Sequence, residues 1–392
     1  MSAPHLILHL GAPKCGSSAL QAALTAQPDH PSGRDGLRLC YVGCRRGRRA
    51  LIPYYGGAVR VAGRRSVFGY LNWPNLDPHI DESVLFDALQ QVVRRGQRRG
   101  YVPILSSEGW IAHPKWFAAN LEAMGNPPVE AVAFLRPPID WINAAWWQWG
   151  IWGDQSLDAW LNRGDLTYRF GPLLERWAGI PNLRLHVRPT RPDVVDGFAG
   201  LFGLALPAPA VRNAAVPASL TGFFLRNRRF RRTGHDAAAE FVFQRWCPAT
   251  GEARSWAVLP RHMHRLRPLV AETRKRLAPL LNDREAAALF ADPRWGAETA
   301  YHDTILAGPS RPHDPASLPG LHAALANGLA TAARELGKSR PVIPAGLPSG
   351  AALEDWDQVI SPMLETLLHL DATWRAGAIR RFFLRVRRPR TG

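Results

Sequence analysis

Short apolar runs separated by segments of helical periodicity are the dominant pattern in the first half of the chain. Four runs have the length and composition of buried strands: residues 5–10, 101–105, 129–135 and 183–187. Segments with helical spacing follow the first three, and residues 83–95 place their apolar side chains on one face of a helix that leads into the second run. This alternation predicts an α/β fold in which a central parallel sheet is covered by helices on both faces, giving three layers.

The pattern changes in two places along the chain. Residues 32–75 are rich in Gly and Arg and have no sustained period, so we interpret them as an insertion of loops and short strands near the mouth of the sheet. After residue 213 the pattern becomes helical. Helices are expected at 220–232, 261–281 and 283–290, and Pro- and Gly-rich linkers or loops at 308–320 and 339–350. We therefore divide the chain into an α/β core, residues 1–232, and a mainly helical C-terminal region with a basic tail, residues 233–392.

Composition narrows the classes of protein without selecting one. The 392 residues include 49 Lys and Arg against 32 Asp and Glu, a formal net charge of +17 that attracts anions in general. Nucleic acid, acidic glycan, an anionic membrane and a polyanionic nucleotide all fit this charge. The four cysteines form no CxxC pair and have no zinc-like spacing with His, so we expect free thiols and no metal site.

Targeting features predict a cytoplasmic protein. The chain begins in a strand pattern without a basic leader or cleavage site, and no apolar run approaches the roughly 20 residues needed to span a bilayer. The stretch at 379–390 is basic and amphipathic. It has two interpretations, a solvated cationic tail or a peripheral contact with an anionic membrane, which would be the inner face.

The most informative segment joins the first strand to the first helix. Residues 5–21 read HLILHLGAPKCGSSALQ: a strand, a glycine-bearing turn, and a helix that opens at Gly16. Such a junction presents unpaired backbone N–H groups and the positive end of the helix dipole. The hydroxyls of Ser17 and Ser18 and the ammonium of Lys14 would complete an anion cradle.

The position of the lysine distinguishes this loop from that of a nucleotide triphosphatase. In the motif GxxxxGK[ST], lysine follows the second glycine, with a hydroxyl for magnesium behind it. Here Gly11 and Gly16 have the glycine spacing, but Ser17 takes the lysine position and Lys14 lies within the loop. From there it would approach the bridging oxygen of a phosphosulfate, whose transfer needs a stabilised leaving phosphate and no magnesium. The alternative is a turn that merely joins a strand to a helix.

These residues resemble the sulfotransferase family, whose 5′-phosphosulfate loop has a Pro-Lys-x-Gly-[Ser/Thr]-[Ser/Thr] core after the first strand. The flanking residues, His9, Gly11, Leu20 and Gln21, are similar to those of bacterial sulfotransferase-like proteins. The resemblance covers about residues 5–232 and implies a P-loop-NTPase-like fold with 3′-phosphoadenosine 5′-phosphosulfate as the donor. It implies that the loop binds the donor through Pro13, Lys14, Cys15, Gly16, Ser17, Ser18 and Ala19.

A second nucleotide contact is expected at the end of the third predicted strand. Arg136 follows this strand, and ligands of such folds bind at the carboxyl ends of the strands, where a guanidinium can grip a phosphate. The resemblance implies that Arg136 binds the donor's 3′-phosphate together with a Ser on the next helix. This chain has Ala144 at the serine position, with Asn143 beside it as a replacement. Losing the serine removes a hydrogen bond to a charged group, about 1.5 to 3 kcal/mol.

Two residues are candidates for the base that takes the acceptor's proton. Glu108 follows the second strand in the sequence ILSSEGW, on the same rim as Lys14 and Arg136, and a Ser-Ser-Glu at this point recurs in the family that the chain resembles. His9, near the end of the first strand, is the second candidate, and a structural histidine is its alternative. Lys14 would stabilise the leaving phosphate.

Together these features predict a sulfotransferase that transfers a sulfuryl group to an acceptor hydroxyl. The resemblance implies a carbohydrate or glycolipid acceptor, and no specific nucleic acid is expected. Two alternatives stay open: a catalytically impaired relative that binds polyanions or nucleotides, and a P-loop kinase.

Overall fold

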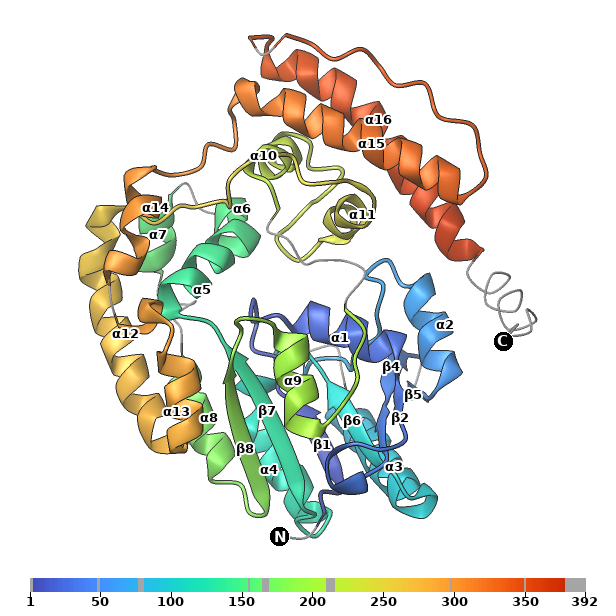
Figure 1. Ribbon diagram of the computed structural model, residues 1–392, viewed down its shortest axis with the longest axis vertical. Helices are drawn as coiled ribbons and strands as arrows, with labels where there is room; N and C mark the ends of the chain where they lie inside the picture. Colours follow the sequence, from blue (N-terminus) through green and yellow to red (C-terminus); the bar gives the residue numbers. More distant parts are fainter. Residues whose placement is uncertain are drawn as a thin grey trace.

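The four runs that the sequence predicts as strands lie side by side in one parallel sheet (Figure 1). They form β1 (Leu6–His9), β6 (Val102–Ser106), β7 (Val129–Leu135) and β8 (Leu183–Pro189). Every residue of β1, β6 and β7 is buried, because helices cover both faces of the sheet. Strands buried on both faces have continuous apolar sequences, which explains why these three were recognised.

This computed structural model describes residues 3–47, 50–76, 81–153, 156–163, 169–208, 216–296, 298–348 and 350–377. The basic tail, with its two interpretations as a solvated segment or a membrane contact at residues 379–390, lies outside the described residues.

Two further strands complete a six-stranded sheet in the order β2-β3-β6-β1-β7-β8. Strand β3 (Leu39–Tyr41) pairs parallel with β6, and β2 (Asp29–His30) pairs antiparallel with β3 at the edge. The segment expected to be an insertion therefore supplies one strand of the central sheet. It also contains the hairpin β4 (Gly43–Arg46) and β5 (Leu51–Tyr54) and the helix α2 (Gly57–Arg65).

Helices form the outer two layers. On one face α1 (Ser17–Ala26) packs against α9 (Val194–Phe202) and α2. The other face is covered by α3 (Glu82–Arg99), α4 (Pro114–Ala123) and α8 (Phe170–Ala178). The predicted α/β class with a mostly parallel central sheet is thus confirmed.

The described part of the chain after residue 216 contains helices and no strand, but these helices divide between two cores. In the first core, α12 (Met263–Leu277) packs on α8, and α13 (Asp283–Phe290) packs on β8. The second core is built by α10 (Ala218–Arg226), α11 (Ala238–Trp246), α15 (Leu318–Glu335) and α16 (Leu353–Ala376). We call these four helices the helical unit; it lies above the carboxyl ends of the strands in Figure 1.

The connection from β7 to α8 runs along the space between the two cores. It begins with α5 (Pro138–Ala145), continues through a π-helical turn, Trp146–Gly150, and ends in the short helices α6 (Ile151–Gly153) and α7 (Leu157–Asn162). After α13 the chain stays at the first core and also forms α14 (His302–Leu306), whose Ile305 packs against that core. The predicted helix at 283–290 has the bounds of α13, whereas the predicted linker at 308–320 ends earlier, because α15 begins at Leu318.

Candidate functional site

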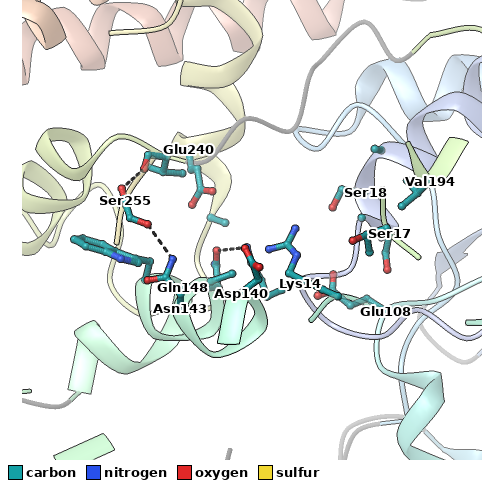
Figure 2. Close-up of a pocket in the computed structure, with 18 of the residues that line it drawn as sticks. Lys14, Ser17, Ser18, Glu108, Asp140, Asn143, Gln148, Val194, Glu240 and Ser255 are labelled. Atoms are coloured by element: carbon teal, nitrogen blue, oxygen red, sulfur yellow. Dashed lines mark hydrogen bonds between the residues drawn. The ribbon is translucent and has the colours of Figure 1, made fainter. Parts of the chain in front are cut away.

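A cavity of about 1050 Å³ opens where the carboxyl ends of the strands face the helical unit. The start of α1, the loop after β6, the end of β7, α5 and the segment before α11 all contribute to its lining. Figure 2 shows Ser17 and Ser18 on one side of this space and Glu240 and Ser255 on the other. Of the residues predicted to bind or react, those that line the cavity are Lys14, Gly16, Ser17, Ser18, Ala19, Glu108, Arg136, Asn143 and Ala144.

The loop between β1 and α1 has the backbone of an anion cradle. Lys14 and Gly16 both have positive φ, 59° and 89°, and this curl turns the start of α1 toward the cavity. A side chain at Gly16 would also meet Val194 at 2.7 Å. Ser17 is 4% exposed, and its buried Oγ has no hydrogen-bond partner among the described residues. An unpaired buried hydroxyl beside the free N–H groups of a helix start is the arrangement that a bound anion would satisfy.

Close backbone contact brings Glu108 to the same loop. Gly109 N donates to Gly11 O at 2.7 Å, and Ile111 N donates to Leu10 O at 2.8 Å. Because these bonds join the loop after β6 to the loop after β1, the carboxylate of Glu108 lies close to Lys14, and both the backbone N–H and the charge of that lysine favour its ionised form.

Burial and charge act against each other on these two groups. Burial raises the pKa of Glu108, and the positive charge of Lys14 opposes that rise without cancelling it. Burial also lowers the pKa of Lys14, while the carboxylates of Glu240 and Glu108 oppose the fall. The raised pKa makes Glu108 a stronger base than an ordinary glutamate. The lowered pKa of Lys14 means that its ammonium form is less favoured than in water, so an anion bound beside it would stabilise that form.

Three predicted residues do not face the cavity. His9 is buried, its Nδ1 lies 2.7 Å from Ser106 Oγ, and burial lowers its pKa to about 3, so the ring is neutral. Cys15 is buried, and burial raises the pKa of its thiol to about 12. Pro13 contributes its carbonyl, which accepts a hydrogen bond from Trp141 Nε1 at 2.7 Å. His9 therefore stands as a structural histidine in this conformation, and Pro13 and Cys15 shape the loop.

Of the residues predicted to contact the donor's 3′-phosphate, two line the cavity as expected and one is engaged elsewhere. Arg136 follows β7 and lines the cavity, as does Ala144. Both ends of the Asn143 amide, however, bind backbone: Nδ2 donates to Ser255 O at 2.9 Å, and Oδ1 accepts from Ala257 N at 2.8 Å. Asn143 thus anchors a segment that is distant in the sequence, and its amide has no group left to replace the missing serine.

That segment brings an arginine that sequence reasoning did not identify. Arg254 lines the cavity, with its side chain 41% exposed, and Nη1 donates to Asp140 Oδ1 at 2.9 Å. The buried Asp140 also accepts from Tyr301 Oη at 2.9 Å and pairs with Arg294 Nη1 at 3.3 Å. One carboxylate therefore orients two arginines beside Arg136. No local sequence signal marks Arg254, because it lies in an irregular stretch between α11 and α12 and reaches the site through tertiary packing.

Aromatic side chains form another part of the cavity wall, which we call the aromatic wall. Phe68, Tyr70 and Phe241 line the cavity, with ring centroids 5.1 Å apart for Phe68 and Phe241. Tyr70 Oη lies 3.1 Å from Ser18 Oγ, so this wall adjoins the cradle. Phe68 is 39% exposed, so part of this apolar wall is open to solvent.

Other classes of site are not evident in the described ranges. No three His, Cys, Asp or Glu side chains of these residues group as a metal site would require, and none of their helices has the length and apolarity of a bilayer span. All four cysteines are free. No protein-family model matches the chain, and neither curated proteins nor solved structures gave a match.

Proposed function

We propose that this protein is a sulfotransferase that uses 3′-phosphoadenosine 5′-phosphosulfate as its donor and transfers the sulfuryl group to an acceptor hydroxyl. The observation that carries the proposal is the convergence on one cavity of the α1 start, the unpaired Ser17 hydroxyl, Lys14 and Glu108. We propose with it that the fold is P-loop-NTPase-like, with the lysine moved into the loop.

In the proposed reaction, one bond forms and one breaks at sulfur. The acceptor oxygen attacks sulfur as the bond from sulfur to the bridging oxygen breaks, and the electron pair of that bond stays on the 5′-phosphate of the leaving adenosine 3′,5′-bisphosphate. The acceptor proton passes to Glu108. Lys14 stabilises the charge that develops on the bridging oxygen, and the N–H groups at the start of α1 with Ser17 and Ser18 hold the 5′-phosphate. The products are the bisphosphate, a sulfate ester and a proton.

Two arginines beside the start of α5, Arg136 and Arg254, fit the donor's 3′-phosphate. Arg136 stands where the family resemblance implies such a contact, and Arg254 adds a second guanidinium, 41% exposed and oriented by Asp140. We propose that Arg254 compensates for the serine that is absent at Ala144, since the Asn143 amide is bonded to backbone. Two guanidinium groups suit a dianionic phosphate, because each can donate two charge-assisted hydrogen bonds.

The acceptor would lie against the aromatic wall. Phe68 and Tyr70 come from the Gly- and Arg-rich segment between the first two predicted strands, and Phe241 comes from α11. This part of the cavity is therefore built by segments outside the strands that form the predicted core. Aromatic faces beside carboxylates suit a sugar ring, and a carbohydrate or glycolipid acceptor remains our proposal. The cytoplasmic location and the contact of the tail with a membrane remain predictions.

Thermal unfolding in the presence of nucleotides tests the proposal. Adenosine 3′,5′-bisphosphate should raise the melting temperature in a saturable way, while ATP with magnesium should have little effect. No shift with the bisphosphate, or a larger shift with ATP, contradicts the proposal, and the second result favours a P-loop kinase.

A second candidate is a catalytically impaired relative that binds polyanions or nucleotides. The alanine at position 144 and the engaged amide of Asn143 favour it. Acceptor-independent cleavage of the phosphosulfate donor to bisphosphate and sulfate, followed by chromatography, separates the two. Saturable bisphosphate binding without any cleavage would select the impaired relative, and salt-sensitive heparin binding without bisphosphate binding would select a polyanion-binding protein.

A further inference from the structure

A π-helical turn places one amide side chain between the two cores. The turn, Trp146–Gly150, directly continues α5, and Gln148 is its middle residue. Turns with this wider hydrogen-bond pattern are rare and are often found at functional sites. Gln148 is half-buried and lines the same cavity as Lys14.

Both ends of the Gln148 amide are bonded, and to opposite sides of the cavity. Its Oε1 accepts a hydrogen bond from Lys14 Nζ at 3.1 Å, and its Nε2 donates to the carbonyl oxygen of Gly234 at 2.8 Å. Gly234 belongs to the segment that enters α11. Buried Arg231 strengthens this junction, since its Nη2 donates to Gly234 O at 3.0 Å and to Gln148 O at 3.3 Å.

The backbone at Gly234 packs too closely against the turn at Gln148 to accept a side chain. A Cβ at position 234 would lie 2.6 Å from the carbonyl oxygen of Gln148 and 3.0 Å from Trp149 Cα. Because both of these are backbone atoms, they cannot move aside as a flexible side chain would. The backbone at Gln148 is thus held against the segment that joins α10 to α11 in the helical unit.

A neutral amide suits the charge balance around Lys14. Four charged groups act on the ammonium: Glu240 and Glu108 favour its charged form, whereas Arg136 and Arg231 disfavour it. An amide oxygen can hold the ammonium in place while leaving its full charge for an incoming anion. A carboxylate at the same place would pair with the ammonium and compete with that anion.

We propose that Gln148 is a positioning residue for Lys14, which holds the ammonium toward the cavity without neutralising it and ties this position to the helical unit through Gly234. The role of Lys14 in stabilising the leaving phosphate rests on the proposed function. The hydrogen bond from Lys14 to Gln148 does not depend on that function, and its effect on the titration of Lys14 can be measured directly.

The first test measures the titration of Lys14 itself. The chain has four lysines, Lys14, Lys115, Lys275 and Lys338, so protein labelled with ¹³Cε-lysine gives few NMR signals, and Lys14→Arg assigns the one of interest. Gln148→Met keeps the shape of the side chain but removes the acceptor, which should lower the pKa of Lys14. Gln148→Glu keeps an acceptor oxygen and adds a charge, which should raise it. A merely structural glutamine would not move this pKa in opposite directions.

The matched control is Gln97→Met on α3, whose Nε2 lies 3.1 Å from His5 Nδ1 outside the cavity. It should leave the Lys14 titration unchanged. If Gln148→Met shifts the midpoint by less than about 0.3 pH units, or if both substitutions shift it in the same direction, the proposal is overturned.

The second test uses acceptor-independent cleavage of the phosphosulfate donor. Gln148→Met should lower the cleavage rate constant roughly 10-fold with little change in KM, because the lysine is misplaced for the transition state more than for binding. Gln148→Glu should also weaken binding of adenosine 3′,5′-bisphosphate. Wild-type protein that neither cleaves the donor nor binds the bisphosphate would refute the proposed function. Cleavage that is normal in Gln148→Met would refute only the role given to Gln148.

The third test addresses the link to the helical unit. Gly234→Ala adds a single methyl group, whose Cβ would displace the backbone of Gln148, so it should reproduce the loss of cleavage expected for Gln148→Met. Gly200→Ala on α9 is the control, since nothing lies within 4 Å of its Cβ position. Normal cleavage and an unchanged Lys14 titration in Gly234→Ala would disprove the link.

Discussion

A Cβ atom on Gly11 would lie 2.0 Å from the carbonyl oxygen of Ser107. The glycine has φ of +40°, and its own carbonyl accepts the hydrogen bond from Gly109 N. The loop after β1 and the loop after β6 are therefore in backbone contact at this point, and that contact sets the distance between the anion cradle and Glu108.

Gly11→Ala should therefore disrupt the site as well as the fold. Backbone strain and a clash with backbone atoms together should cost about 3 kcal/mol or more in the free energy of unfolding. Urea unfolding measures this loss, and bisphosphate binding should be lost with it. Gly100→Ala is the control: Gly100 also has positive φ, +67°, but has nothing within 4 Å, so it should cost only about 1 kcal/mol. Equal losses in the two variants would contradict the role of the contact.

Glu108→Gln should abolish donor cleavage while sparing donor binding. The amide has the shape of the carboxylate but cannot take a proton, so the rate should fall at least about 10²-fold. Isothermal titration with adenosine 3′,5′-bisphosphate should give an affinity close to that of the wild type. Glu122→Gln, at an exposed position of α4, should leave both unchanged. Retained turnover in Glu108→Gln would move the base elsewhere.

The rate of donor cleavage should depend on pH through both buried groups. The base must be deprotonated, and burial raises the pKa of Glu108, so activity should be lost as pH falls through a value above that of an ordinary glutamate. Lys14 must be protonated, and burial lowers its pKa, so activity should also be lost as pH rises through a value below that of an ordinary lysine. A plateau that extends to the ordinary values on both sides would contradict this arrangement.

Arg254→Ala should weaken binding of the 3′-phosphate alone. The affinity for adenosine 3′,5′-bisphosphate should fall about 10- to 100-fold, the loss expected for a hydrogen bond to a charged group. The affinity for 5′-AMP, which lacks the 3′-phosphate, should stay the same. Arg276→Ala is a matched control, because its side chain is 42% exposed, is paired with carboxylates and lies outside the cavity. An equal loss for both nucleotides would show that Arg254 acts on the site as a whole.

A buried charge network at the β7–β8 edge should make stability depend on pH. His186 Nε2 lies 2.9 Å from Glu130 Oε2, and Nδ1 lies 3.6 Å from Glu285 Oε1. Burial opposes the charge of His186, but the two carboxylates outweigh it and raise its pKa. Burial likewise opposes the charges of Glu130 and Glu285, yet His186 and the nearby Arg34 and Arg188 outweigh it and lower both pKa values.

The sign of each shift defines the pH window. The histidine contributes stability that is present below its unfolded pKa, about 6.5, and lost as pH rises through its folded value. The carboxylates contribute stability that is present above about 4.3 and lost as pH falls through their folded values. The network should therefore stabilise most between these limits. Urea unfolding at pH 5.5 and 8 should show the alkaline loss in wild type, and His186→Phe should remove the difference.

The sequence predicts those features of the fold that are made by consecutive residues. Strands β1, β6 and β7 are buried on both faces, so each is a continuous apolar run. The loop before α1 is likewise local, because its glycine turn, lysine and helix start are consecutive. Residues 32–75 were predicted to hold short strands, but the sequence does not indicate that β3 belongs to the central sheet. The strand has three residues in a Gly- and Arg-rich context, and only its pairing with β6 places it there.

Half of the candidate site depends on contacts between distant residues. Arg254 reaches the cavity because Asn143 and Asp140, more than 100 positions earlier, bind its segment. Gln148 meets Lys14 across 134 positions, and only the turn after α5 directs it there. Neither residue has a motif around it, so spacing along the chain could not identify them. His9 shows the converse, since its position near a strand end suggested chemistry that its burial beside Ser106 does not support.

The chain passes between its two cores three times: it enters the helical unit before α10, returns for α12 and α13, and enters again at α15. A fragment that stops at residue 308 would thus keep α10 and α11 while losing α15 and α16, and would expose Phe223 and Trp246 to water. The helical unit cannot be trimmed off or grafted onto another protein by a single junction.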